Sequence, residues 1–438
     1  MHFHSRFGGV LLASAIVVAA CGSSPATATP TLGPTASALP SAGITASATL
    51  GATPGATPSA TPNASADLAT YTQIETQVEA LRELAPKSSV TPILLDEQGV
   101  RDWMTKAMES GVDHTALAAE SRLFSHLGLL PAGASLEQLE LDLDAGQALG
   151  FYDADTKQLY LLSTSGTVGA EEQWVFSHEF THALQDQNFG LDQLAIDAPN
   201  QGDRDLARTA LPEGDATLSM MQWAERNMSI LGLLSSAFSA LGPQTDQFNN
   251  APAILREDLM FPYDAGLSFV EGVYEKGGWA AVDRLYAKPP NSTSQILHPE
   301  LYTAGIGPVA VTLGAVPATL GTGWKLTYQD TMGELQLRVW LGGEHPTDAQ
   351  AKAADSAASS WAGDRIGLYE GPSGAWAVVL RTQWRSTSGR TAFVAAANQT
   401  LDGLSSPSAV CGDAIHADII IASDPTVLGS FTTCQPGE

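Results

Sequence analysis

The feature that most constrains this chain is a long segment near its start that cannot contribute to a hydrophobic core. Residues 22–66 are mainly Ala, Thr, Pro, Ser and Gly, with no acidic or basic side chain before Asp67. Such a composition buries too little apolar surface to offset the entropy that folding costs. We therefore expect residues 21–66 to be a disordered, partly extended tether, followed by a globular body from residue 67.

The residues before this tether have the pattern of an export signal. Residues 7–20 (FGGVLLASAIVVAA) are apolar and uncharged. This run is too short to cross a bilayer as a helix, but it suits the core of a signal peptide. It ends in small residues directly before Cys21, as a bacterial lipobox does. We expect residues 1–20 to be a lipoprotein signal peptide, with a lipid on Cys21 anchoring the protein outside the cytoplasm. The alternative is an ordinary secretory signal with an incidental cysteine.

The charge balance excludes one class of partner. The chain has 21 Lys and Arg against 47 Asp and Glu, a net charge of −26. Binding to nucleic acid needs clustered basic side chains, so we expect no nucleic-acid partner. Polybasic contact with anionic lipid is disfavoured too, and no later apolar run reaches the length of a transmembrane helix. Membrane contact is therefore expected through lipidated Cys21 only.

The other two cysteines, Cys411 and Cys434, form a natural pair once Cys21 carries lipid. Export places them in an oxidising compartment, where disulfides form. Closing the loop between them would stabilise the fold by roughly 3–4 kcal/mol. The alternative is two free thiols.

Apolar periodicity predicts a first domain over residues 67–304 that is rich in helices. Residues 136–144 alternate partly between apolar and acidic side chains, which favours a half-buried element with a solvated face. Residues 150–163 are typical of a β-hairpin, with its turn at 153–155. Helices are expected at 71–84, 97–109, 115–127, 170–187 and 212–228, the last with a proline near its first turn.

A second domain is expected over residues 305–438, because the pattern changes to short apolar strands between helices. Their order, β-α-β-β-α-β, predicts a split βαβ or ferredoxin-like unit. The expected strands are 335–341, 365–371, 375–384 and 417–423, and the expected helices are 349–363 and 390–401.

The predicted helix at 170–187 carries the residues that point to chemistry. His178 and His182 are four residues apart, so both imidazoles lie on one face of a helix and can grip one metal ion. Glu179 lies beside them, where it can take a proton from a metal-bound water. The alternative is two surface histidines on an amphipathic helix.

A zinc site needs a third protein ligand and an open fourth position. We expect Glu213, in the sequence ALPEGDAT, to be that ligand, with Glu225 as a weaker competitor. Asp215 could orient a ligating histidine through its second ring nitrogen. Its alternative role is that of an acid favoured by the dipole in the first turn of a helix.

These residues resemble a known class of enzymes. The sequence HEFTHALQDQ (178–187) followed by EGDA (213–216) looks like exported bacterial gluzincins, the thermolysin-like zinc metallopeptidases. The gap between His182 and Glu213 is longer than in thermolysin. The resemblance implies a zincin fold for the first domain, and the expected fold class is therefore α+β. Further pieces agree: LGLLP (127–131), GFYD (150–153), SQILHPELY (294–302) and SWAGDRIGLYEG (360–371).

The mechanism then expected is zinc-dependent hydrolysis of peptide bonds. Zinc held by His178, His182 and Glu213 lowers the pKa of its water to about 7. Glu179 acts as general base and later returns the proton to the leaving amine. A second group should stabilise the oxyanion.

For this oxyanion donor we expect His298 first, with Tyr302 and Tyr263 as alternatives. Each has a purely structural alternative: a His-Pro turn for the histidine, and packing with a wet hydroxyl for the tyrosines. The substrate is expected to be a peptide or protein. The rival hypothesis is a surface binding or assembly lipoprotein that keeps a zincin domain without cleaving anything.

Overall fold

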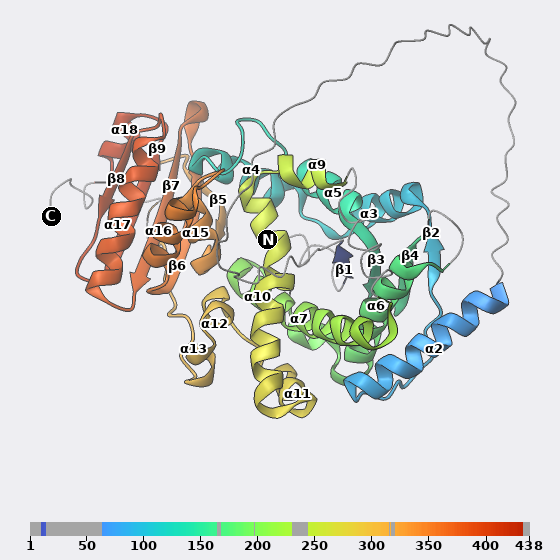
Figure 1. Cartoon of the computed structure of the whole chain (residues 1–438). Helices are drawn as coiled ribbons and strands as arrows, with labels where there is room; N and C mark the ends of the chain where they lie inside the picture. Colours follow the sequence, from blue (N-terminus) through green and yellow to red (C-terminus); the bar gives the residue numbers. More distant parts are fainter. Residues whose placement is uncertain are drawn as a thin grey trace, which may run out of the picture.

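The computed structural model describes residues 10–14, 64–163, 168–196, 198–229, 244–314, 316 and 320–431. Figure 1 shows a helical body beside a smaller unit built on a sheet, so the α+β class expected from the sequence is confirmed. Most of the predicted signal peptide and tether, and Cys434, lie outside the described residues. Within the described ranges, no helix is long and apolar enough to cross a membrane.

The helical body follows the predicted elements closely at its start. Helix α2 spans Ala64–Arg82 and so begins inside the segment predicted as tether. The expected helices at 97–109 and 115–127 are confirmed as α3 (Glu97–Gly111) and α4 (His114–Leu127). The carboxylates of Asp96 and Asp113 cap them by accepting backbone N–H groups of the first turn. The other helices are α5 (Leu136–Gln147), α6 (Ala170–Phe189), α7 (Gly202–Asn227), α9 (Gln244–Asn250), α10 (Ala253–Gly277), α11 (Trp279–Ala287), α12 (Thr293–Leu297) and α13 (Pro299–Thr303), with a 3₁₀ turn at Leu191–Leu194.

Helix α7 differs from the prediction because it starts at Gly202, not at Pro212. Proline lacks the N–H that a helix interior uses, so it was expected near the first turn. The residues before it nevertheless extend the helix, since Leu206 and Ala210 are buried in the main core. The Gly202 N–H at the new start donates to Asp330 Oδ1 at 2.9 Å.

The first sheet has the strand order β1-β3-β4-β2. Strands β3 (Ala148–Asp153) and β4 (Gln158–Leu162) form the expected hairpin, which is confirmed. Strand β2 (Ile93–Leu95) runs parallel to β4, and β1 (Val10–Ser14) runs antiparallel to β3. Both β3 and β4 pack against α6, the helix with the two histidines.

The second sheet has the order β5-β6-β7-β9-β8, and every neighbouring pair is antiparallel. Strands β7 and β8 are therefore parallel to each other, with β9 inserted between them. Joined through α17, they form one split βαβ unit, but its last strand is β8: the strand predicted at 417–423 is β9, which runs antiparallel to β7. The elements are β5 (Lys325–Asp330), α15 (Gly333–Gly342), α16 (Asp348–Ala358), β6 (Trp361–Glu370), a 3₁₀ turn (Pro372–Gly374), β7 (Trp376–Trp384), α17 (Thr387–Asp402), β8 (Ser408–Cys411), β9 (His416–Ala422) and α18 (Pro425–Gly429).

The first half of the predicted ferredoxin-like unit is wrong, because residues 335–341 form helix α15 and not a strand. The sequence LQLRVWL alternates like a strand, but most of α15 is buried, and a helix buried on several sides shows no clear 3.6-residue period. Asp364 fixes its start by accepting the N–H groups of Met332 and Gly333 at 2.9 Å each. Neither edge strand of this sheet, β5 or β8, was predicted.

One hydrophobic cluster joins the helical body to the second sheet. It contains Leu127 and Leu143 from the body and Ile366 and Val378 from the sheet, and the Trp340 indole donates to the Leu127 carbonyl at 3.1 Å. The domain boundary expected between residues 304 and 305 stays a prediction.

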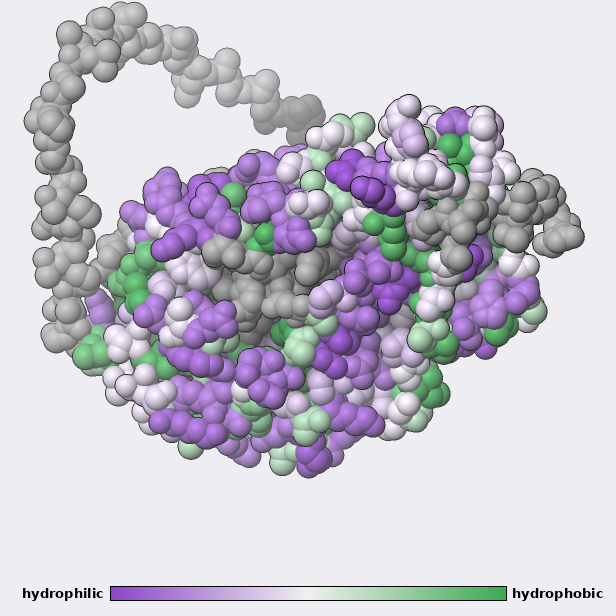
Figure 2. Space-filling model, turned by 180° about the vertical axis from the view of Figure 1, so that it is seen from behind, coloured by the Kyte–Doolittle hydropathy of each residue, from purple (hydrophilic) through white to green (hydrophobic). Residues whose placement is uncertain are grey.

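Seen from behind, the surface is mostly hydrophilic with scattered hydrophobic residues (Figure 2). Cys411 is disulfide-bonded.

Candidate metal centre

Helix α6 places both histidines in the interior. Its start is capped by Glu172, whose carboxylate accepts the Gly169 N–H at 2.9 Å, and Gly190 ends it with a φ of 73°. Every residue from Val175 to Asp186 is buried, including His178, Glu179 and His182. The alternative of two surface histidines on an amphipathic helix is therefore wrong, because both side chains are buried.

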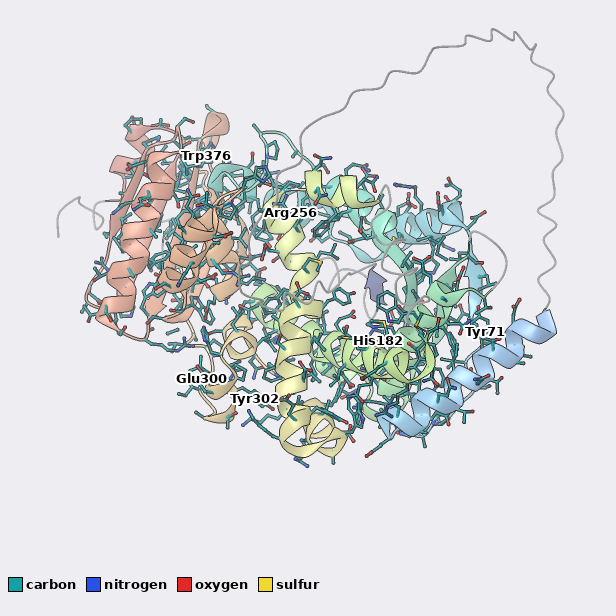
Figure 3. The ribbon with its side chains drawn as sticks, viewed as in Figure 1. Tyr71, His182, Arg256, Glu300, Tyr302 and Trp376 are labelled. Atoms are coloured by element: carbon teal, nitrogen blue, oxygen red, sulfur yellow. The ribbon has the colours of Figure 1, made fainter. Side chains whose placement is uncertain are left out.

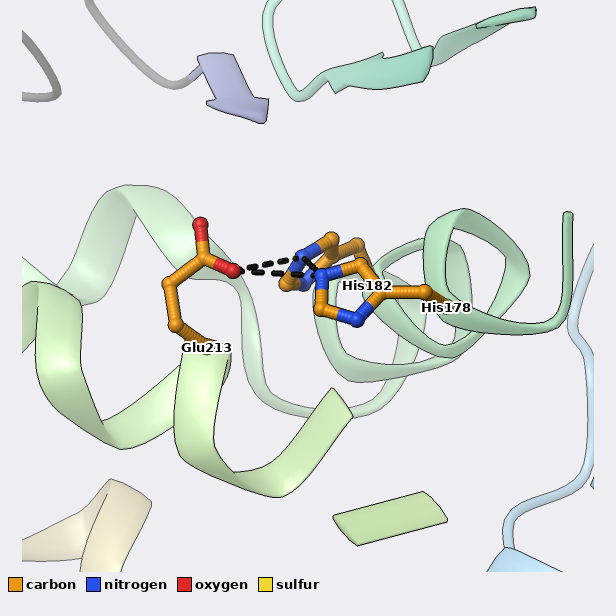
Figure 4. Close-up of side chains that lie close together, drawn as sticks. All are labelled: His178, His182 and Glu213. Carbon is orange, nitrogen blue, oxygen red and sulfur yellow. Dashed lines mark hydrogen bonds and ion pairs between the residues drawn. The ribbon is translucent and has the colours of Figure 1, made fainter. Parts of the chain in front are cut away.

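Glu213 of α7 meets these two histidines. Its Oε2 lies 3.2 Å from His178 Nε2 and 3.4 Å from His182 Nε2, and the two Nε2 atoms are 2.9 Å apart (Figure 4). All three side chains are buried, and they are the group that could hold a metal ion among the described residues. Glu225, the weaker competitor, is exposed.

The distances from Glu213 Oε2 to the two imidazole nitrogens fit a small cation, whereas the two Nε2 atoms lie closer together than tetrahedral ligands would. Bonds of about 2.0–2.2 Å from zinc to histidine and carboxylate place tetrahedral ligand atoms roughly 3.3–3.5 Å apart. Burial lowers the pKa of His178. Burial alone would raise the pKa of Glu213, but the adjacent imidazoles lower it to about 2. A neutral imidazole and an ionised carboxylate are the forms that bind metal.

Gln185 sets the proton position on His182. Its Nε2 donates to the Pro212 carbonyl at 3.0 Å, so its Oε1 faces His182 Nδ1 at 2.9 Å. Because a carbonyl oxygen only accepts, His182 Nδ1 carries the proton and Nε2 keeps its lone pair toward the site. Gln185 thus connects one ligand to the segment that precedes Glu213.

Tyr263 of α10 also lies at this centre. Its ring lies 6.2 Å from that of His178 between centroids. Burial and the nearby carboxylates of Glu213 and Glu179 raise its pKa well above the ordinary value. The phenol is therefore protonated and can donate a hydrogen bond beside the triad.

Two glycines bring α10 this close to α7. A Cβ on Gly214 would lie 2.2 Å from the Gly266 carbonyl oxygen, and one on Gly266 would lie 2.3 Å from that of Ala210. Only glycine permits such an approach of two helix backbones. Gly214 directly follows Glu213, and Gly266 follows Tyr263 by about one helical turn. The contact between the two glycines therefore sets the spacing of the Glu213 and Tyr263 side chains.

Asp215 is not the residue that orients a histidine. Its carboxylate accepts from Arg82 Nε at 2.6 Å, from Arg82 Nη2 at 3.0 Å and from the Tyr286 hydroxyl at 2.7 Å. Arg82 is fully buried at the end of α2 and also contacts Asp283 and the face of Trp279. The pair fastens α2 to the helix that carries Glu213.

The other two oxyanion candidates have different surroundings. His298 Nε2 lies 2.7 Å from Glu334 Oε1, which raises the pKa of that imidazole, and its Nδ1 lies 3.9 Å from Glu300. The Tyr302 hydroxyl donates to the Lys288 carbonyl at 2.6 Å. In Figure 3, Tyr302 lies across α10 from His182. Of the three candidates, Tyr263 is the one that the structure brings to the triad.

Sequence reasoning missed Gln185, Arg82 and the Gly214–Gly266 contact. Gln185 had a local signal, since it follows His182 by three residues and so lies on the same helix face. Arg82 and Asp215 are 133 residues apart in the chain, and no local pattern links them.

Comparison with known proteins adds little about this centre. A family described as a domain of unknown function, DUF8575, matches residues 324–420, which include none of the triad. A search of the curated proteins finds no match. Among solved structures the chain is similar to a provisionally assigned hydrolase with a novel fold from Chloroflexus aurantiacus, at 18% identity and a TM-score of 0.36, over 54% of this chain and 88% of that one. A likeness of this size supports no argument about activity.

Proposed function

We propose that this chain is a zinc-dependent metallopeptidase of the gluzincin, thermolysin-like class, with a zincin-like first domain. The observation that carries the proposal is the convergence of His178 and His182 with Glu213 at 2.9–3.4 Å inside the protein. Two histidines and one glutamate are the ligand set of that class of zinc enzyme. Metal binding alone does not require a second buried acid, Glu179, in addition to Glu213, so the presence of Glu179 favours catalysis.

The roles of the residues follow from their chemistry. Zinc would be held by His178, His182 and Glu213, and when bound it supplies Lewis-acid chemistry toward water and a carbonyl. Glu179 accepts the proton of the attacking water and delivers it to the amine that leaves. Gln185 holds His182 in the tautomer that presents Nε2.

We assign the oxyanion-stabilising hydrogen bond to Tyr263 in preference to His298. The Tyr263 phenol is protonated and buried next to Glu213 and Glu179. A buried donor of this kind stabilises developing negative charge more strongly than an exposed one. His298 is instead engaged by Glu334.

The cellular setting in this proposal comes from the sequence alone. Cleavage before Cys21 and lipidation of that cysteine would anchor the enzyme on the outer face of the membrane, with residues 21–66 as a spacer. Its substrates would be peptides or proteins outside the cytoplasm. The second candidate remains a surface binding lipoprotein that retains the metal but does not cleave.

The deciding experiment compares Glu179→Gln with wild type on a library of fluorogenic peptides, with zinc content measured for both. We expect Glu179→Gln to keep its zinc and lose at least about a hundredfold in kcat/KM, the usual size of a general-base contribution. The matched control is Glu225→Gln on the exposed face of α7, which should leave both unchanged. Zinc binding without turnover in wild type would favour the binding lipoprotein.

A further inference from the structure

A cavity of about 580 Å³ lies on the outer face of the second sheet, the face turned away from α15 and α17. Side chains alternate between the two faces of a strand, so Arg381 lies on the same side as Val379, which packs in the hydrophobic cluster of this face. The volume is within the range of about 300–1,000 Å³ that is usual for ligand sites. The cavity is lined by residues 310–312, 381–383, 411–413, His416 and Asp418, none of which belongs to the triad.

Arg381 belongs to a row of charged side chains that runs across this face. The strand register places Arg365 of β6 opposite Arg381 of β7, and Asp418 of β9 opposite Arg381 on its other side (Figure 1). Like charges on directly opposite residues repel each other. Arg365 donates to the Asn200 carbonyl at 2.7 Å and forms no salt bridge within the described residues. The row therefore holds two cations for one carboxylate, which favours an anionic ligand.

The guanidinium of Arg381 has donors to spare. Its Nε lies 3.3 Å from Asp418 Oδ2, but this ion pair lacks the geometry of a hydrogen bond, and the Nε atom is buried without an acceptor. A Cβ on Gly314 would lie 2.9 Å from Arg381 Nη1, so this glycine lets the guanidinium lie against the segment before it. Buried N–H groups are normally hydrogen-bonded. Unused donors that line a cavity point to an acceptor that binds there.

The segment at the rim of the cavity offers unpaired main-chain groups. The Val309 N–H donates to the Ala362 carbonyl at 2.7 Å, and Leu313 is buried in the cluster of this face, so the segment is held at both ends. Between these two residues, the N–H groups of 310–312 make no hydrogen bond within the described part of the chain. Unpaired main-chain groups are what an extended peptide pairs with.

We propose that this cavity binds an extended peptide through a carboxylate, with Arg381 as the carboxylate receptor and residues 310–312 as the partner of the peptide backbone. The planar fork of an arginine matches a carboxylate with two parallel hydrogen bonds. A phosphate group is disfavoured, because its higher charge would meet Asp418 and also Asp413, which His416 Nδ1 contacts at 2.8 Å. The site binds a peptide and breaks no bond, so the proposal does not rest on the proposed function.

The test is affinity selection of random pentapeptides on the immobilised full chain in the presence of a chelator, read by mass spectrometry. The chelator prevents hydrolysis and binding through a metal ion. One library has free C-terminal carboxylates and the other has C-terminal amides. We expect the free acids to be retained at least about tenfold more than the amides, because hydrogen bonds to charged groups are the strong ones.

The amide library also tells the two sources of a carboxylate apart. Amides retained only when they contain Asp or Glu would show that a side chain supplies the group, whereas retention of free acids alone assigns it to the C-terminus. Free acids and amides that are retained equally, without acidic residues among them, would overturn the proposal.

Arg381→Met should lower the retention of carboxylate peptides at least about tenfold. The matched control is Arg338→Met, because Arg338 lies on α15, pairs with Glu257 and Asp355, and does not line the cavity. Circular dichroism checks that both variants are folded. Equal retention by the two variants would contradict the role given to Arg381.

Thr312→Pro tests the main-chain partner independently of the guanidinium. It removes one N–H that makes no hydrogen bond within the described residues, so the fold should tolerate it. The affinity for the best retained peptide, measured by fluorescence anisotropy, should fall at least about threefold. Thr312→Val keeps the N–H and should bind as wild type does. Equal affinities of the two variants would refute pairing along 310–312.

This proposal and the proposed function fail separately. Peptide retention that depends on Arg381, in a chain that binds no zinc and hydrolyses no peptide, would keep the carboxylate site and refute the peptidase. Hydrolysis by a wild-type chain that shows no preference for carboxylates would do the reverse.

Discussion

Gly214 of α7 and Gly266 of α10 bring two helix backbones into direct contact next to the candidate metal centre. The space for a Cβ on Gly214 is taken by the Gly266 carbonyl, 2.2 Å away. Glu213 precedes the first glycine, and Tyr263 lies one turn before the second. The contact therefore holds a proposed ligand and the proposed oxyanion donor at a fixed separation.

Replacing Gly214 should disturb both stability and the metal site. We expect Gly214→Ala to lower the free energy of unfolding by about 1–3 kcal/mol, the usual cost of overpacking, and to weaken zinc binding. Urea titration and a zinc competition assay measure the two effects. The control is Gly272→Ala on α10, where no atom lies within 4 Å of the added Cβ. Because alanine is the better helix former, this control should be neutral or stabilising by up to about 1 kcal/mol.

Removing Gln185 should weaken zinc binding without unfolding the protein. Gln185→Met takes away the acceptor that fixes the His182 tautomer. We expect the affinity for zinc to fall by about 10–100-fold, as is usual when the partner of a ligating histidine is removed. Gln187→Met is the matched control on the same helix, since Gln187 contacts only the backbone of the 87–88 loop in its described interactions. Equal zinc affinities in the two variants would refute the role given to Gln185.

The buried Arg82–Asp215 pair should be costly to break from one side. Arg82→Met leaves a buried carboxylate without its cation, so we expect a loss of about 3–5 kcal/mol in urea titrations. Arg82→Met combined with Asp215→Asn should recover part of that loss. The exposed pair Arg101–Asp142 serves as the control, and Arg101→Met should cost less than about 1 kcal/mol.

How far the sequence predicts this molecule depends on the range of the interactions involved. The HEFTH motif lies within one helix, so its two histidines could be placed on one face from spacing alone. The hairpin at 150–163 could also be predicted, because its two strands are neighbours in the chain. The α7–α10 contact and the Arg82–Asp215 pair join distant segments, and no local pattern encodes them. Residues 335–341 were predicted as a strand, although they form α15. This helix is buried on several sides, so its apolar residues do not repeat with the helical period.

Asp203 should make stability fall as the pH rises. It is buried at the start of α7, and burial, with Asp364 and Glu334 nearby, raises its pKa to about 8. Between its ordinary pKa of about 4 and this value, the folded state binds more protons than the unfolded state. The free energy of unfolding therefore decreases from pH 4 to pH 8.

Asp203→Asn should flatten this dependence, because asparagine keeps an acceptor for the Thr293 N–H without carrying a charge. Urea titrations at pH 5 and pH 8 should show a smaller difference for the variant, by more than about 1 kcal/mol. The exposed substitution Asp192→Asn is the control. A wild-type protein that is more stable at pH 8 than at pH 5 would oppose this account of Asp203.

The central claim is that His178, His182 and Glu213 bind one zinc ion, and metal content tests it most directly. Mass spectrometry of the metals in purified full chain should find about one zinc per chain in wild type and in Glu225→Gln. Glu213→Gln, which keeps the size of the side chain but not its charge, should lose most of that zinc. A folded wild-type protein without zinc, or a Glu213→Gln variant that binds it as tightly as wild type, would contradict the claim.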